Sequence, residues 1–301
     1  MAQPAPKATE VYAANVLHLD DDFSFSGDKR NLILGCYDAV LLQKNNVNNS
    51  SRTAQKSMDD AMRGMSYGRL RYSHFDPSIQ KPPKFDEMTL LSGMYFKSNF
   101  LDETTTLAKF YPPTRKNGVL VPMMIVRGHF TQFYDPVGVT VLGMDLMYGD
   151  QTLYIFFPKS RYGLNRVERE LGWKYLKVLM RHSVKTFEGT ILLPKIEANN
   201  IMEMKKYLEK IGLSEVMNQP NLGNLFRGKK QPRTITGLHH SAQFKMYERI
   251  PINNEWARNR LKELESEENY FKINHPFLFL VMDNASGAIL LFGRCLNPSI
   301  R

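Results

Sequence analysis

The stretch from His239 to Arg294 constrains the fold more than any other part of the chain. It contains two apolar blocks, Phe277–Met282 and Ala288–Phe292, separated by a short run of Asp, Asn, Ala, Ser and Gly. This pattern predicts a β-hairpin of two buried strands. Upstream, His240–Tyr247 alternates apolar and polar side chains, as a half-buried strand does. The chain is therefore expected to end in paired strands, joined to an upstream strand by a highly charged segment that contains Pro251.

Length and composition allow a large core. With 301 residues, of which 43% are apolar, the chain can bury such a core as one big domain or as two. No uninterrupted apolar run is long enough to cross a bilayer, so no membrane span is expected. Residues 1–10 read MAQPAPKATE and lack the apolar segment of a secretion signal. We expect them to form a flexible tail.

The net charge of +10 could direct the chain toward nucleic acid, heparin-like polyanions or other acidic surfaces. Its densest cluster falls in one expected loop, and an ordinary solvated loop is the favoured interpretation. No aromatic side chains are interleaved with these cations, so no specific nucleic-acid site is expected. The candidate polyanion-binding residues are Arg227, Lys229, Lys230 and Arg233.

The sequence offers few sites for disulfide bonds, glycosylation or metal binding. Cys36 and Cys295 are the only cysteines; they can pair or stay free, and they indicate no disulfide scaffold. Glycosylation sequons at Asn48, Asn49 and Asn284 matter only if the chain is secreted. The seven histidines show no convincing metal-ligand spacing, so no metal site is expected.

Hydrophobic periodicity predicts strands and helices in mixed order. Alternating or continuous apolar runs predict strands, and apolar residues at helical spacing predict helices. Expected strands lie at 11–19, 39–43, 88–96, 107–111, 119–126, 129–134, 139–147, 152–157, 184–193 and 240–247, and expected helices at 28–37, 52–63, 164–171, 174–181 and 201–211, the last ended by Gly212. The pattern indicates an α+β fold and not alternating βαβ units.

Two motifs imitate catalytic or phosphate-binding sites. Residues 64–68 match the G-x-S-x-G nucleophile elbow, which would make Ser66 the nucleophile of a hydrolase. A helix precedes this motif and none follows it, so a helix-terminal turn is the favoured interpretation. Residues 223–229 nearly match a phosphate-binding loop, but Lys230 replaces the hydroxyl residue that would bind Mg²⁺. We therefore expect no catalytic residue and no cofactor.

A set of motifs carries a family resemblance. Residues 271–279 contain F-x-x-x-H-P-F-L-F, and residues 289–294 read I-L-L-F-G-R, followed by Pro298. Upstream, in order, are Y-F-K-S at 95–98, V-P-M-M at 121–124, L-P-K at 193–195 and L-x-x-I-G-L at 208–213. Together they resemble the serpins, a family of serine protease inhibitors, in family order over residues 11–301. The signature residues are Phe271, His275, Pro276, Phe277, Gly293 and Arg294.

The resemblance implies a fold, a partner and a setting. It implies one serpin-like domain over residues 11–301, with several mixed or antiparallel β-sheets and surrounding helices. A serine protease is the implied partner. Family members are mostly secreted, which favours an extracellular location, but this chain shows no signal peptide and an intracellular location stays open.

The resemblance also indicates a missing part. The long N-terminal helical bundle of serpins, and the strand that closes their back sheet, have no counterpart in this sequence. The hairpin at 277–292 would then have an uncovered edge and an exposed apolar face. Such surfaces promote oligomerisation, aggregation or partner binding.

Serpins inhibit proteases by a conformational trap, which enters here as what the resemblance implies. A protease cuts an exposed loop, here equivalent to about 249–270, whose N-terminal half then inserts into the main sheet as a new strand. The hinge of that loop requires glycine and small residues. The aligned residues are Glu248, Arg249, Ile250 and Pro251. Isoleucine is stiff, and proline lacks the donor that a central strand requires.

The rest of the loop is equally unsuited to insertion. In a strand, one face of residues 250–264 would carry Arg258, Arg260 and Lys262, and the other would carry two glutamates. Leaving an unpaired charge buried costs on the order of several kcal/mol. Residues 253–264 instead place Ala257, Leu261 and Leu264 on one helical face. We expect a short surface helix or a disordered loop.

Spacing back from Phe271 places the expected scissile bond within Glu263, Leu264 and Glu265. The sequence thus predicts a serpin-family protein that inhibits weakly or not at all and has a binding or substrate-like role. A working inhibitor that acts by loop insertion is the alternative, and a hydrolase using Ser66 is a remote third.

Overall fold

The computed structural model describes most of the chain. The described residues are 9–19, 23–43, 51–71, 88–98, 102–133, 138–146, 149–172, 174, 176, 178, 183–222, 224–227, 234–246 and 255–299. They divide into two compact units, each built around one β-sheet. Unit 1 comprises residues 1–10, 97–198 and 244–301, and unit 2 comprises residues 11–96 and 199–243. The single domain over residues 11–301 stays a prediction.

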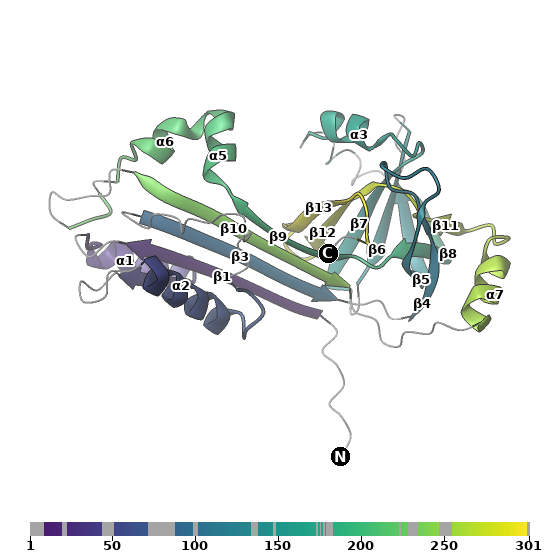
Figure 1. The fold of residues 1–301 in the computed structure, drawn as a ribbon, viewed down its shortest axis with the longest axis horizontal. Coiled ribbons are helices and arrows are strands. Elements are labelled where there is room, and N and C mark those ends of the chain that lie inside the picture. Colours follow the sequence, from purple (N-terminus) through teal and green to yellow (C-terminus); the bar gives the residue numbers. More distant parts are fainter. Residues whose placement is uncertain are drawn as a thin grey trace, which may run out of the picture. The chain divides into compact units, whose positions relative to one another are not determined.

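A five-stranded sheet organises unit 2 (Figure 1). Its strand order is β2-β1-β3-β10-β9, and β1 and β2 are parallel. The ends of some of its strands lie in unit 1. The bounds are β1 Thr9–Leu19, β2 Ala39–Gln43, β3 Met88–Ser98, β9 Glu197–Glu203 and β10 Ile235–Met246.

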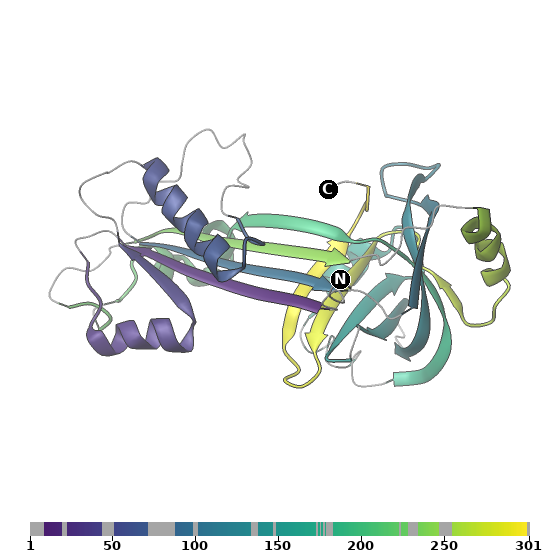
Figure 2. The ribbon, with the colours of Figure 1, turned by 90° about the horizontal axis from the view of Figure 1, so that it is seen from below.

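Helices α1 (Gly27–Cys36) and α2 (Ser51–Met65) accompany the first strands of this sheet, and Figure 2 shows α2 lying across them. Met58 and Met62 of α2 are buried against β1 and β3, in a cluster completed by Ala14, Val16, Leu70, Leu91 and Tyr95. The apolar positions spaced four apart along α2 explain this packing. The predictions for both helices and for β1 and β2 are confirmed.

The expected helix at 201–211 is partly wrong. Residues 201–203 complete β9, and the helical segment begins only at α5 (Lys205–Leu208) and continues through the π-helical turn η1 (Glu209–Leu213) to α6 (Ser214–Asn218). Pairing of β9 with β10 outweighs the helical periodicity of residues 201–203, because tertiary pairing overrides local propensity. Gly212 adopts φ 97° and ends the first helical segment as expected.

An eight-stranded sheet organises unit 1. The strand order is β11-β8-β5-β6-β7-β12-β13, and β4 pairs with β5 outside this path. The bounds are β4 Asp102–Phe110, β5 Val119–Phe133, β6 Val139–Asp145, β7 Gln151–Pro158, β8 Ser183–Pro194, β11 Tyr270–Lys272, β12 Phe277–Asp283 and β13 Ile289–Cys295. The two strands expected at 119–126 and 129–134 are one strand, β5, because its pairing with β8 continues through Gly128, opposite Gly189.

The hairpin prediction is confirmed. β12 and β13 pair antiparallel, and the Asp283 N–H donates to the Ala288 carbonyl at 2.9 Å across the turn. The Asp283 carboxylate accepts from the Ser286 hydroxyl at 2.5 Å and from the Ser286 N–H at 2.8 Å. These bonds fix the turn, and the hydroxyl, followed by the N–H, lowers the pKa of Asp283. The sequon residue Asn284 lies in this turn and donates to the Gly149 carbonyl at 2.8 Å.

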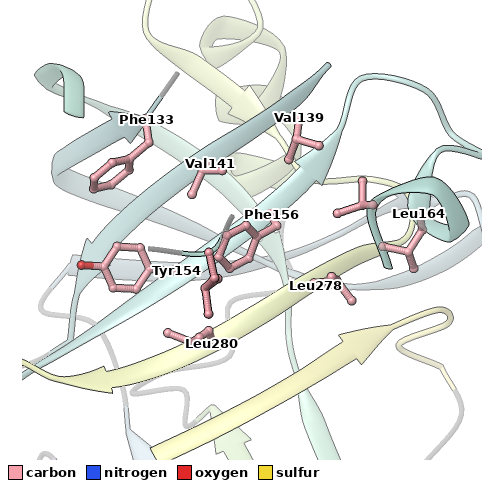
Figure 3. Close-up of a cluster of buried hydrophobic side chains, with 10 residues drawn as sticks. Phe133, Val139, Val141, Tyr154, Phe156, Leu164, Leu278 and Leu280 are labelled. Carbon is pink, nitrogen blue, oxygen red and sulfur yellow. The ribbon is translucent and has the colours of Figure 1, made fainter. Parts of the chain in front are cut away.

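Two further helices belong to unit 1. Helix α3 (Leu164–Glu170) packs on β7, and Leu164 and Val167 join the cluster drawn in Figure 3. That cluster also contains Phe133, Val139, Val141, Tyr154, Phe156, Leu176, Leu278 and Leu280. Helix α7 (Glu255–Leu264) lies next to β4 (Figure 1). Most of the expected helix at 174–181 lies outside the described residues, although Lys174, Leu176 and Val178 are helical.

Cys36 is an exposed free thiol and Cys295 is a buried one, so the two do not form a disulfide. Burial raises the pKa of Cys295 to about 12. In the part of the chain that is described, no helix combines the length and the apolar content that a bilayer crossing requires.

Candidate functional site

One candidate functional region is the junction between β3 and β10, in the five-stranded sheet. These strands are direct neighbours in the five-stranded sheet. The Thr236 hydroxyl donates to the Met88 carbonyl at 2.8 Å, and it lies 3.3 Å from the Thr89 hydroxyl. β3 and β10 therefore pair directly in the five-stranded sheet, and no strand lies between them.

Side chains along this junction alternate between a buried and a half-buried face. On β10, Ile235, Gly237, His239 and Ser241 are buried, and the residues that alternate with them are half-buried. Burial lowers the pKa of His239 to about 4, so its imidazole is neutral at pH 7. The shift corresponds to roughly 3 kcal/mol against a positive charge at this position. The buried face of the junction is thus an unfavourable environment for charge.

A separate candidate region, in unit 1, is helix α7, which occupies the sequence positions of the expected reactive loop. The Ser266 hydroxyl donates to the Glu263 carbonyl at 2.6 Å, and the Glu267 N–H donates to the Leu264 carbonyl at 3.0 Å. Leu264 is 0% exposed, whereas Glu263 and Glu265 are exposed. The expected scissile residues therefore lie in a hydrogen-bonded helix terminus, and the central one points into the protein.

The segment after α7 is anchored to β8. Glu265 forms an ion pair with Lys272 at 2.5 Å, and burial, followed by the Glu265 carboxylate, raises the pKa of Tyr270. The Thr190 N–H donates to the Asn269 carbonyl at 3.0 Å. A Cβ built on Gly189 would lie 2.4 Å from that carbonyl oxygen, so only glycine fits there. This anchor fixes the C-terminal end of the loop region.

Two groups of predicted residues are not covered by the described part of the chain. The first is the whole hinge, which consists of Glu248, Arg249, Ile250 and Pro251. The second is most of the basic cluster, namely Lys229, Lys230 and Arg233. Arg227 is described and exposed, and its N–H donates to the Ser24 carbonyl at 2.7 Å.

The signature residues come together around β11, β12 and β13. The Phe271 ring lies 5.5 Å from that of Phe187, and Phe277 is 0% exposed. Gly293 leaves room for the ring of Phe279, which a Cβ would approach to 2.5 Å. Arg294 forms an ion pair with Glu168 of α3 at 3.2 Å. These residues shape the hairpin and its packing.

His275 is a structural residue of this cluster. Its Nε2 lies 2.8 Å from the Pro158 carbonyl, and its Nδ1 lies 3.1 Å from the Asn274 amide. Burial lowers the pKa of His275, so the ring is neutral and Nε2–H is the donor to Pro158. Pro276 follows it directly and immediately precedes β12.

Sequence reasoning missed Arg161. Its guanidinium donates to the carbonyls of Pro112 at 2.8 Å and Arg115 at 2.5 Å, and it lies over the rings of Tyr111 and Tyr162 at 5.2 and 5.3 Å. These contacts fix the loop between β4 and β5. A single arginine in a loop carries no sequence signal for such a role.

Ser66 lies in the turn that ends α2, as expected. It is 0% exposed, its Oγ donates to the Met62 carbonyl at 2.7 Å, and it accepts from the Leu70 N–H at 2.8 Å. Both hydrogen bonds make this hydroxyl a structural cap. Among the described residues, no three His, Cys, Asp or Glu side chains lie close enough together to hold a metal ion.

Comparisons with known proteins agree with this geometry. The family model described as Serpin (serine protease inhibitor) matches residues 2–298. Antithrombin-III from Ovis aries is 24% identical over 310 residues, covering 98% of this chain and 64% of the relative. Serpin B10 from Papio anubis is 24% identical over 269 residues, covering 85% of this chain and 65% of the relative. The chain thus spans less than two thirds of the length of these relatives.

Solved structures share the fold. Uncleaved ovalbumin superposes with a TM-score of 0.78 at 18% identity, covering 98% of this chain and 75% of that one. Native protease nexin-1 with heparin superposes with a TM-score of 0.77 at 17% identity, covering 96% and 77% of the two chains.

Proposed function

This chain belongs to the serpin family, whose members are generally serine protease inhibitors, and from that premise we propose that it does not trap proteases by loop insertion. It acts instead as a binding or substrate-like member of the family. A serine protease can dock on the loop and cleave it, but the cleaved loop stays outside the main sheet. The protease then leaves unharmed.

The single observation that carries the proposal is the charged helix α7. Insertion requires this helix to unfold and to enter the β3–β10 junction as a strand. In one register Arg258, Arg260 and Lys262 fall on the buried face, and in the other Glu255 and Glu263 do. Each uncompensated charge costs on the order of several kcal/mol. The neutral state of His239 on β10 supports this, because that position already disfavours charge.

The hinge sequence supports the same conclusion. Insertion begins at the hinge, where Ile250 restricts the backbone and Pro251 offers no N–H to the neighbouring strand. Both residues therefore disfavour the first step of insertion, before any charged residue of the loop enters the sheet.

Substrate-like cleavage also has a preferred chemistry. Acidic residues flank Leu264, so a trypsin-like protease is disfavoured at the expected scissile bond. Arg258 and Arg260 are the better sites for simple cleavage by such an enzyme. Cleavage at either arginine separates the hinge from the anchored segment that begins at Glu265.

A protease panel tests the proposal. We expect cleavage within residues 249–270, no covalent complex that survives SDS, and no rise in melting temperature after cleavage. The control is antithrombin-III with thrombin under the same conditions. A band stable to SDS that contains both chains, or a large rise in melting temperature on cleavage, would overturn the proposal.

Inhibition by loop insertion is the second candidate. The observation that favours it is the five-stranded sheet, in which β3 and β10 are direct neighbours and a loop strand would have to separate them. A covalent complex in the same panel is the result that distinguishes it.

We further propose a heparin-like polyanion as a ligand of Arg227, Lys229, Lys230 and Arg233. The net charge of +10 supports this, and one structural neighbour, protease nexin-1, was solved with heparin. The double variant Lys229→Glu/Lys230→Glu should elute from heparin at much lower salt than Lys116→Glu/Lys159→Glu. Elution of the two variants at the same salt concentration would exclude this cluster as the heparin-binding site.

An extracellular location stays a proposal. It is supported by the family resemblance, because serpins are mostly secreted. Glycan analysis of the chain expressed in a eukaryotic host tests the location through the sequons. An unglycosylated, cytosolic product would contradict it.

A further inference from the structure

We propose that the solvent-facing surface of β4 and β5, beside helix α7, is a docking site for the serine protease that cleaves the loop. The site consists of Leu107, Lys109, Leu120 and Pro122, which we call the β4–β5 patch. The proposal rests on the proposed function, in which a serine protease recognises the loop as a substrate. It adds a second contact, outside the loop, that selects which protease binds.

The four residues of the β4–β5 patch lie on one face of the sheet. β4 and β5 pair antiparallel, with Leu107 opposite Pro122 and Lys109 opposite Leu120. Opposite residues in antiparallel strands point to the same face, and so do alternate residues along one strand. The four side chains therefore form one contiguous block.

This face is exposed to solvent, whereas the other face of the same two strands is core. Leu107 is 42% exposed and Leu120 is 66% exposed, and the other two members of the patch are exposed as well. The residues that alternate with them are buried: Ala108, Phe110, Val121 and Met123. A sheet with one solvated face usually carries polar residues there, but three of the four here are apolar. Contiguous exposed apolar side chains of this kind mark interaction surfaces.

The β4–β5 patch adjoins the loop region. Helix α7 lies next to β4 (Figure 1), and Leu264 at the end of α7 is 0% exposed. Thr105, two residues before Leu107 on the same face of β4, is only 8% exposed. Directly after β4, the Tyr111 N–H donates to the Asn274 carbonyl at 2.7 Å. The patch therefore lies on the strand that contacts α7 and that is tied to the segment following the loop.

Interface size argues for a protease as the occupant. A stable protein–protein interface buries about 800 Å² on each partner. A loop segment of a few residues supplies only part of that area, so a protease bound at residues 263–265 must also cover the surface next to α7. Members of this family are generally serine protease inhibitors, so a serine protease is the partner that this surface meets.

The charge of the β4–β5 patch selects among proteases. Lys109 has no ion-pair partner in the part of the chain that is described, and it lies opposite the exposed Leu120. The patch therefore offers an apolar surface with one positive charge. It fits a protease whose surface beside the substrate cleft is apolar and carries an acidic residue, and it disfavours a protease that is basic there.

Docking at the β4–β5 patch should act on KM. The contact is outside the scissile bond and is made equally in the ground state and the transition state, so it lowers KM without changing kcat. It also holds the protease beside α7 until the helix opens. Cleavage requires that opening, because Leu264 is buried.

The first test measures the cleavage kinetics of the 301-residue chain with trypsin, plasmin, thrombin and neutrophil elastase. With at least one of them, Leu120→Asp should raise KM by about fivefold or more and leave kcat unchanged, as expected for the loss of a central interface contact. Lys109→Glu should have the same effect. The matched controls are Ile211→Asp and Lys210→Glu, which make the same changes at exposed positions of η1. Circular dichroism and thermal melting establish that all four variants fold.

The second test does not depend on cleavage. Each protease, with its catalytic serine replaced by alanine, is passed over the immobilised chain in surface plasmon resonance. For the protease identified in the first test, Leu120→Asp should weaken binding by about fivefold or more. The parent chain already cleaved within residues 249–270 should retain this binding, because the patch is outside the loop.

The outcomes separate this proposal from the proposed function. If Leu120→Asp and Ile211→Asp affect cleavage equally with every protease, the docking site is wrong and the substrate-like role stands. If binding depends on Leu120 but the loop is never cleaved, the docking site stands and the substrate-like role is wrong. Faster cleavage of Leu120→Asp would mean that the substitution opens α7, and it would overturn the docking site. Neither binding nor cleavage by any protease would overturn both.

Discussion

At the scale of single residues, close packing decides what the loop region tolerates. Gly189 of β8 lies against the backbone carbonyl of Asn269, with no space for a Cβ. Because the obstacle is backbone and not a flexible side chain, the strand and the segment after α7 must separate to admit one. The same contact holds the C-terminal end of the expected reactive loop to the sheet.

We predict that Gly189→Ala destabilises the protein by about 1–3 kcal/mol, the usual cost of overpacking a tight core. Gly64→Ala is the control, since no atom lies within 4 Å of the position of its Cβ in α2. This substitution should be neutral or stabilising by about 0.5–1 kcal/mol. Urea denaturation measures both, and equal stabilities of the two variants would contradict the packing argument.

At the scale of elements, the sequence predicts those that local pattern determines. The hairpin β12–β13 follows from apolar blocks around a turn, and β2 and α2 follow from clear alternation or helical spacing. β9 was missed because its polar, acidic residues gain strand structure only by pairing with β10. Arg161 was missed because its carbonyl partners are distant in sequence. Long-range contacts leave no local pattern.

In the loop region, too, local pattern predicts the helix but not its long-range packing. The helical face of Ala257, Leu261 and Leu264 predicts α7, and the helix is present. The burial of Leu264 depends on packing next to β4, which the sequence does not encode locally. The hinge and most of the basic cluster lie outside the described residues, so their roles stay predictions.

Helix α7 should limit access of proteases to the expected scissile bond. Leu264→Ala removes a fully buried side chain, at a cost of about 2 kcal/mol or more. Local opening of α7 should then become roughly 30-fold more frequent, and cleavage near residues 263–265 by a broad-specificity serine protease should accelerate in proportion. Lys262→Ala, at an exposed position of the same helix, is the control. If both variants are cleaved at the rate of the parent chain, α7 does not protect the bond.

At the scale of the whole molecule, we propose that the balance between two states determines function. In one state β3 pairs with β10 and the loop is helical; in the other, a loop strand separates them. A strand added to the sheet gains backbone hydrogen bonds, while each charge that it buries costs several kcal/mol. The sequence of the loop, and not the strand order of the sheet, should therefore decide which state follows cleavage.

A redesigned loop tests this balance. The variant Ile250→Gly/Pro251→Ala/Arg258→Ala/Arg260→Ala/Lys262→Ala keeps the chain length, removes the stiff hinge and clears one strand face of charge. After cleavage near residues 263–265, its melting temperature should rise well above that of its uncleaved form, whereas cleavage of the parent chain should leave the melting temperature unchanged. A matched variant, Arg169→Ala/Lys206→Ala/Lys210→Ala, loses the same three positive charges elsewhere and should behave as the parent does. If cleavage stabilises the parent chain as strongly as the redesigned one, buried charge does not prevent insertion. The chain would then be expected to trap proteases as an inhibitor.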